Sequence, residues 1–145
     1  MQRMRDPIYL YLKPGAPPPR LDGVGPFKAV VVVDGEVPPA WQAEVSEWLV
    51  RSGCRYMMAC GLNCSSWDDS VDEANLKRFD FGDIPEDEFV MTTWHDEGFM
   101  EAFQFCKQWA VHPVLELENV YIVHIADGAR PSQLLEAFHL SLKDE

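Results

Sequence analysis

The run FKAVVVVD, residues 27–34, limits what this chain can fold into more than any other stretch of the sequence. It is a continuous β-branched run rather than an alternation of apolar and polar residues. A strand of that kind is buried on both faces, which is typical of a parallel sheet covered by helices. We therefore expect an α/β fold with this strand inside the sheet.

The rest of the chain alternates between strand and helix patterns. Strands are expected at 54–62, 89–94 and 119–127, with a short edge strand at 7–12, and helices at 39–52, 98–111 and from Pro131 to about Leu142. This alternation predicts a three-layer sandwich: a mostly parallel sheet of four to five strands with helices on both faces.

Length and cysteine usage indicate a single reduced domain. A chain of 145 residues is expected to form one domain, with residues 1–26 as an N-terminal strand and Pro-rich linker and residues 27–145 as a single α/β domain. We find no apolar stretch of about 18 residues and no signal peptide. The four cysteines lack the spacing of a paired zinc motif, so we expect a cytoplasmic protein with free thiols.

A long acidic insert is expected between the strands at 54–62 and 89–94, the second and third of the four main strands. Residues 63–101 hold twelve acidic residues against two basic ones, a net charge of −10, whereas the whole chain carries −12. Ser70 and Glu73 have the spacing of a capping box, which predicts a short helix over about 71–79.

This charge argues against direct binding of nucleic acid or of anionic membranes, and it suits a basic protein partner. The residues expected to bind that partner are Asp68, Asp69, Asp72, Asp83, Glu86, Asp87 and Glu88. An acidic loop that is merely solvated is the competing explanation. A homodimer is also possible, through Met100, Phe105 and Trp109, unless these side chains belong to the core.

The strand ends supply candidate catalytic residues, because the carboxyl ends of parallel strands meet at one edge of a sheet. The candidates are Asp34, Cys64, His95 and Asp127. Cys64 with His95 could form a nucleophilic pair, although acidic neighbours would raise the pKa of the thiol. No glycine-rich phosphate-binding loop is present.

Carboxylates at the same edge could instead hold Mg²⁺ or Mn²⁺. The metal candidates are Asp34, Asp69, Asp96 and Glu97. Acidic residues after strands are also common turn and capping residues, so no cofactor is expected outside this alternative.

The run CSSWDDSVDEANL…FDFGDIP…FVMTTWHDE resembles a family of small uncharacterised bacterial α/β proteins, over most of the chain from about residue 27. That resemblance implies no activity. The sequence thus favours a protein-binding module of immunity, antitoxin or adaptor type that acts through its acidic surface. The alternative is a small metal-dependent hydrolase or phosphotransfer enzyme built on the strand-end carboxylates and His95.

Overall fold

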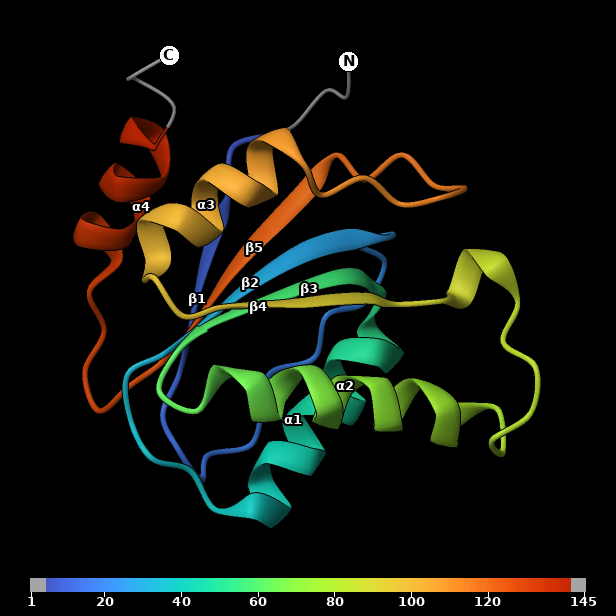
Figure 1. Cartoon of the computed structure of the whole chain (residues 1–145). Coiled ribbons are helices and arrows are strands. Elements are labelled where there is room, and N and C mark those ends of the chain that lie inside the picture. Colours follow the sequence, from blue (N-terminus) through green and yellow to red (C-terminus); the bar gives the residue numbers. More distant parts are fainter. Residues whose placement is uncertain (1–4, 142–145) are drawn as a thin grey trace.

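Five strands form one all-parallel sheet in the order β1-β5-β2-β3-β4, which confirms the α/β class and the parallel sheet. The computed structural model describes residues 5–141 (Figure 1). In chain order the elements are β1 (Ile8–Leu12), β2 (Phe27–Val33), α1 (Pro39–Ser52), β3 (Cys54–Gly61), α2 (Cys64–Arg78), the 3-10 turn η1 (Glu86–Glu88), β4 (Met91–His95), α3 (Phe99–Gln108), β5 (Asn119–Ile125) and α4 (Pro131–Leu140). Leu142, the expected end of the last helix, lies outside the described residues.

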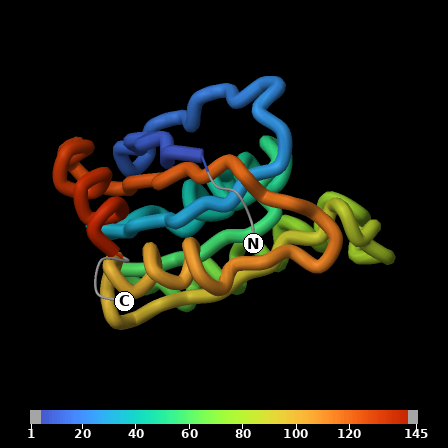
Figure 2. The backbone as a smooth tube through the Cα atoms, turned by 90° about the horizontal axis from the view of Figure 1, so that it is seen from above, coloured from blue at the N-terminus to red at the C-terminus, as the bar shows by residue number. Residues whose placement is uncertain are grey.

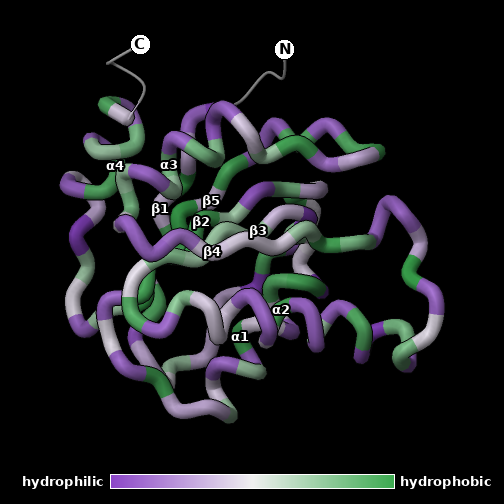
Figure 3. The backbone as a smooth tube through the Cα atoms, viewed as in Figure 1, coloured by the Kyte–Doolittle hydropathy of each residue, from purple (hydrophilic) through white to green (hydrophobic). Residues whose placement is uncertain are grey.

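β2 is the central strand, as its apolar run predicts. All seven of its residues are buried, and it pairs with β3 on one side and β5 on the other. Its side chains alternate between two cores, with Ala29, Val31 and Val33 in one and Val30 and Val32 in the other. The hydropathy colouring in Figure 3 is strongly hydrophobic along the inner strands and pale along β4.

The two cores are covered by different helices. Trp48 of α1 and Trp67 of α2 belong to the core on one face of the sheet. Phe103 of α3 and Phe138 of α4 belong to the core on the other face. Figure 1 shows α1 and α2 below the sheet and α3 and α4 above it.

This arrangement creates a topological switch point between β2 and β5. The two strands are neighbours, but the chain leaves β2 toward α1 on one face and leaves β5 toward α4 on the other. Ligands of open α/β sheets bind at such points, beyond the carboxyl ends of the strands. The residues that follow β2 and β5 are therefore candidates for a ligand-binding site.

The helix α2 begins earlier than the sequence analysis expects. It starts at Cys64, directly after β3, and its buried face is made by Cys64, Trp67 and Val71. The capping-box prediction is wrong, because Ser70 lies inside the helix and its hydroxyl bonds to the Ser46 hydroxyl of α1 at 2.7 Å. Much of the expected insert is thus the crossover helix between β3 and β4.

The N-terminal segment packs against the rest of the molecule. β1 pairs with β5 and so forms one edge of the sheet. The proline-rich stretch after it accepts two hydrogen bonds from α1, from Trp41 Nε1 to the Ala16 carbonyl at 2.7 Å and from Trp48 Nε1 to the Pro19 carbonyl at 2.6 Å.

The four cysteines are buried free thiols. Within residues 5–141, none of the helices has both the length and the apolar character needed to cross a membrane.

Candidate functional site

A chain of hydrogen bonds occupies the switch point between β2 and β5. The Asp34 carboxylate, just after β2, accepts from His124 Nε2 of β5 and from the Arg130 guanidinium, both at 2.7 Å. His124 Nδ1 lies 2.6 Å from the Tyr9 hydroxyl of β1. The Arg130 backbone N–H donates to that hydroxyl at 2.9 Å, which ties the start of α4 to the same cluster.

One arrangement of protons satisfies every member of this cluster. If His124 carries its proton on Nε2, that N–H donates to Asp34, and Nδ1 accepts the Tyr9 O–H. The His124 ring is fully buried, whereas the Asp34 and Arg130 side chains are 32% and 53% exposed. The ring therefore orients a carboxylate that still reaches solvent.

Burial raises the pKa of the Tyr9 phenol, opposed by the hydrogen bond from the Arg130 backbone and reinforced by the nearby charge on Tyr11. The phenol consequently stays protonated at neutral pH and can donate to the ring. The Tyr9 hydroxyl, the His124 ring and the Asp34 carboxylate thus form one continuous chain of hydrogen bonds.

A second chain of the same kind stands on β4. The His95 Nε2 lies 2.8 Å from the Thr93 hydroxyl, and Nδ1 lies 2.9 Å and 3.1 Å from the two carboxylate oxygens of Glu101 on α3. The His95 ring is nearly buried and packs on Phe105, with ring centroids 4.7 Å apart. A hydroxyl, an imidazole and a carboxylate in this order is the arrangement that activates nucleophiles in many hydrolases.

The two hydrogen-bond chains lie at the same edge of the sheet but are well separated. Strand register places His124, Val32, Cys60 and His95 in one row across four strands. Three strand spacings of about 4.8 Å separate the two histidines by roughly 14 Å. Asp34 and His95 therefore belong to two separate clusters.

The other two strand-end candidates take different positions. Cys64 is buried, and its thiol donates to the backbone carbonyl of His95 at 3.7 Å, whereas the His95 ring is occupied by Thr93 and Glu101. Asp127 is exposed in the turn after β5.

The metal candidates are not gathered into a cluster in the part of the chain that the structure describes. Asp69, Asp96 and Glu97 are exposed on α2 and in the turn after β4, and Asp34 is engaged with His124 and Arg130. Within residues 5–141, no group of three or more His, Cys, Asp or Glu side chains is placed to hold a metal ion.

The residues expected to bind a partner lie in two places. Asp68, Asp69 and Asp72 are on α2, and together with Glu73, which was not among the expected residues, we call them the α2 acidic row. Asp83, Glu86, Asp87 and Glu88 lie beyond the other end of α2, and we call them the 83–88 acidic turn. Figure 1 shows this turn projecting at the amino-terminal edge of the sheet. The basic residues Lys77 and Arg78 separate the two groups along the chain.

The α2 acidic row reaches β4 through Asp72. The Asp72 carboxylate accepts a hydrogen bond from the Thr92 hydroxyl at 2.8 Å. Burial raises the pKa of the Asp72 carboxyl; the bond from Thr92 lowers it, and the charges of Asp68 and Asp69 raise it further. Asp68, Asp69 and Asp72 therefore repel one another on α2.

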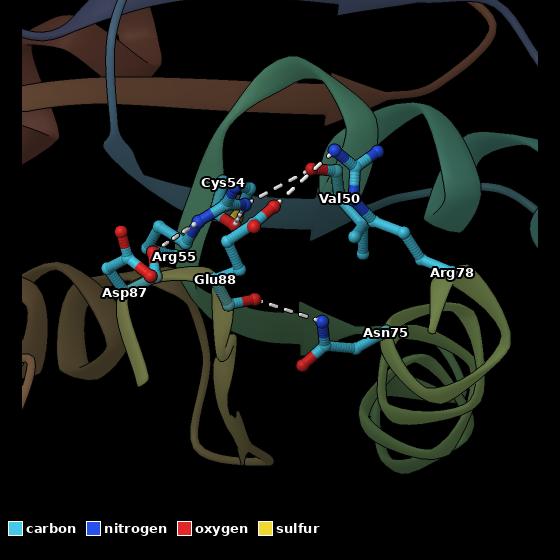
Figure 4. Close-up of polar contacts among 7 residues, drawn as sticks. All are labelled: Val50, Cys54, Arg55, Asn75, Arg78, Asp87 and Glu88. Carbon is cyan, nitrogen blue, oxygen red and sulfur yellow. Dashed lines mark hydrogen bonds and ion pairs between the residues drawn. The ribbon is translucent and has the colours of Figure 1, made fainter. Parts of the chain in front are cut away.

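The 83–88 acidic turn is held in place by its backbone. Figure 4 shows Arg55 of β3 reaching the carbonyl of Asp87 through Nε, at 3.2 Å, and Asn75 of α2 reaching the carbonyl of Glu88, at 3.1 Å. Arg78 Nη2 lies 3.5 Å from the Glu88 carboxylate. The Asp87 carboxylate remains exposed, because only the backbone of that residue is engaged.

The proposed homodimer residues divide between core and surface. Phe105 packs against Tyr56 and His95, with ring centroids 6.1 Å and 4.7 Å away. Met100 and Trp109 are exposed, at 40% and 67%.

Sequence reasoning did not assign Tyr9, Thr93, Glu101 or Arg130 to a site. Tyr9 and His124 are 115 positions apart, so no local pattern connects them. A signal was present for Glu101, since it follows His95 by six positions at the start of an expected helix.

The fold and these clusters define an α/β domain with a parallel sheet, polar side chains at its carboxyl edge and an acidic crossover helix. The chain belongs to the family described as domain of unknown function DUF7684, whose model matches residues 7–141. This confirms the expected membership of a family of unknown function, and the match includes β1. No curated protein matches the chain.

Proposed function

We propose that this domain is a protein-binding module whose α2 acidic row attracts a basic segment of a partner protein. An immunity, antitoxin or adaptor protein would work in this way. The observation that supports the proposal most is the row itself, four exposed or half-exposed carboxylates on one side of α2. Lys77 follows Glu73 by four positions but pairs with Glu47 of α1 at 3.1 Å, and no basic residue lies closer to the row along α2.

The row is unfavourable for the stability of the helix alone. Asp68 with Asp72, and Asp69 with Glu73, are like charges four positions apart, and each such pair destabilises a helix by about 0.2–0.5 kcal/mol. A basic partner would relieve this repulsion, and its association would be fast and sensitive to salt. This repulsion suits a binding surface, although the hydrogen bond from Thr92 gives Asp72 a structural role as well.

The 83–88 acidic turn extends the same field. Its backbone is fixed by Arg55 and Asn75, so its carboxylates are presented without a large loss of conformational freedom on binding. We place it second to the row because Arg78 already pairs with Glu88.

Charge-neutralised variants test this function. The row variant carries Asp68→Asn, Asp69→Asn, Asp72→Asn and Glu73→Gln. The turn variant carries Asp83→Asn, Glu86→Gln, Asp87→Asn and Glu88→Gln. The control variant carries Glu36→Gln, Glu44→Gln, Glu116→Gln and Glu136→Gln, four exposed acids elsewhere on the surface.

Binding of a lysine-rich peptide should weaken at least tenfold in the row variant at low salt, and less in the turn variant. The control variant has the same net charge as each of the others, so it measures the general effect of charge. Equal affinities for the row and control variants would show that the row is only a solvated surface.

A second candidate is a small hydrolase, supported by the Thr93–His95–Glu101 chain. In this proposal His95 Nε2 takes the proton of the Thr93 hydroxyl as that oxygen attacks an ester carbonyl, and it gives the proton to the departing alcohol when the ester C–O bond breaks. Water then hydrolyses the acyl-Thr93 ester with His95 as the base, and Glu101 holds the His95 ring by accepting from its Nδ1–H. Turnover of p-nitrophenyl acetate should disappear in Thr93→Val and in His95→Gln. A rate unchanged from that of His112→Gln, which alters a different buried histidine, would dismiss this candidate.

A further inference from the structure

The outer side of β4 is an open edge of the sheet. β4 ends the strand order, and within residues 5–141 no strand pairs with its outer side. Figure 2 shows β4 along one outer margin of the backbone. Such an edge presents unpaired N–H and C=O groups that another chain can use.

β4 lacks the features that usually block such an edge. Its sequence, MTTWH, has no proline, lysine or arginine. Trp94, on the strand, and Phe89, just before it, are 46% and 40% exposed. An exposed aromatic residue next to free backbone groups favours the addition of a strand.

Acidic side chains flank this edge on both faces. Side chains alternate along a strand, so Thr92 and Trp94 point to the face of α2, and Thr93 and His95 to the face of α3. Thr92 contacts Asp72 of the α2 acidic row, and His95 contacts Glu101. A strand added to β4 would therefore have carboxylates beside its side chains on either face.

We propose that the partner adds an extended basic segment to β4 as a sixth strand, with lysine or arginine at every second position facing the α2 acidic row. This inference rests on the proposed protein-binding function and names the form of the partner. Five paired residues would span about 17 Å, close to the length of β4 itself. Backbone bonds would then supply affinity, and alternate basic side chains would supply selectivity.

The charge at the edge disfavours a second copy of this chain as the occupant. Two β4 edges paired antiparallel about a two-fold axis perpendicular to the sheet would put both α2 acidic rows on the same face of one continuous sheet. Both copies carry a net charge of −12, so approach along this edge is repulsive. A basic segment carries no acidic row and is attracted by the negative charge of this chain.

Two peptides and two variants of the full chain test the inference. The probe is a labelled peptide of alternating lysine and valine, and its control is N-methylated at two adjacent central backbone amides. Neighbouring N–H groups of a strand point to opposite sides, so one of the two faces β4 in either register, and the charge is kept while the hydrogen-bond ladder is broken. Trp94→Lys places a positive charge on the edge. Trp109→Lys makes the same change at the exposed end of α3.

We expect the probe to bind the wild-type chain at least tenfold more tightly than the N-methylated peptide. Trp94→Lys should weaken binding about tenfold, because like charges oppose each other across the new strand, and Trp109→Lys should have less than a twofold effect. Hydrogen exchange at the backbone amides of β4 should slow when the probe binds. Far-UV circular dichroism of both variants checks that they are folded.

The two levels of the proposal fail in different ways. If the row variant described above weakens binding but both peptides bind equally and exchange at β4 is unchanged, the sixth strand is refuted and the acidic surface stands. If the row variant binds like its control, the binding function itself is refuted. A dimer of the wild-type chain that Trp94→Lys separates would show that a second copy occupies the edge and would overturn the inference.

Discussion

Replacing Tyr9 with phenylalanine should destabilise the folded protein by about 2 kcal/mol, although the change removes one oxygen atom. The Tyr9 hydroxyl donates to His124 Nδ1 at 2.6 Å and accepts from the Arg130 backbone N–H at 2.9 Å. The ring of His124 is fully buried and its Nε2 is engaged by Asp34, so its Nδ1 would be left without a partner. A buried acceptor without a partner costs about 1–3 kcal/mol.

The other lost bond should cost little. Arg130 is exposed, so water can replace the phenol as the acceptor for its N–H. The total of about 2 kcal/mol corresponds to a fall in Tm of about 4–8 °C for a chain of this size. Urea unfolding followed by tryptophan fluorescence would measure the free energy of unfolding directly.

Tyr11→Phe is the matched control for this prediction. Tyr11 is on the same strand, and its ring lies 6.5 Å from that of His124, but its hydroxyl makes no hydrogen bond to the described residues. A loss below about 0.5 kcal/mol is therefore expected for Tyr11→Phe. If the two variants lose the same free energy, the hydrogen-bond chain does not fasten β1 to the sheet.

Two further predictions concern buried polar groups. Arg55→Met should reduce the free energy of unfolding by about 3 kcal/mol, because the carbonyls that accept from the Arg55 guanidinium lose a charged donor. Hydrogen exchange across 86–88 should also become faster. Unchanged exchange there would contradict the role assigned to Arg55. Burial raises the pKa of Cys54 and Cys60 to about 12 and that of Cys106 to about 11, from 9.0. The buried thiols contribute their full share of the free energy of unfolding below pH 9. That share is lost as the pH rises toward 11–12, because in this range the thiols ionise in the unfolded chain and not in the folded one. At pH 10 the three thiols should together lose about 4 kcal/mol of stability, at about 1.4 kcal/mol per group. Lys28 reduces this loss, because burial lowers its pKa and its deprotonation at high pH favours the folded protein. A urea midpoint that is the same at pH 8 and pH 10 would refute this account.

The parts of the fold that the sequence predicts well are those with a strong local pattern. The apolar run 27–34 is the central strand, and the helix expected at 39–52 has those bounds in the structure. Both follow from one periodicity and one clear stop, such as Gly53, which adopts the left-handed conformation at the end of α1. The start of α2 was missed, because polar residues separate Cys64, Trp67 and Val71 and hide the apolar stripe.

The clusters at the carboxyl edge needed the strand order, which no local pattern supplies. Asp34 and His95 were expected at one edge, and they are there, but on strands separated by β3. Tyr9 joins His124 only because β1, the first strand in sequence, pairs with β5, the last. Long-range pairing of this kind decides which polar residues meet, whereas the sequence only shows which strands they end.

The acidic segment is a different case. The amino-acid composition was enough to locate it, but only the structure shows that its charges lie in two places. A helix of 15 residues is about 22 Å long, so α2 carries its charges from the carboxyl edge of the sheet to the amino-terminal edge. Asp72 of the α2 acidic row consequently lies against β4, and the 83–88 acidic turn lies past the beginning of that strand.

The carboxylates of the α2 acidic row would affect the β4 edge in two ways, by repelling other copies of this chain and by attracting a basic strand. An open edge without lysine or proline is a hazard, because identical chains can pair along it. Carboxylates next to the edge repel every copy of this chain and every other acidic protein, but they attract a basic strand. The same residues that keep the edge free in the absence of a partner would therefore select the partner. On this reasoning, neutralising the α2 acidic row should do two things at once: weaken the binding of a basic peptide and increase self-association. A row variant that lost peptide binding and stayed monomeric at high protein concentration would show that these carboxylates select a partner without protecting the edge.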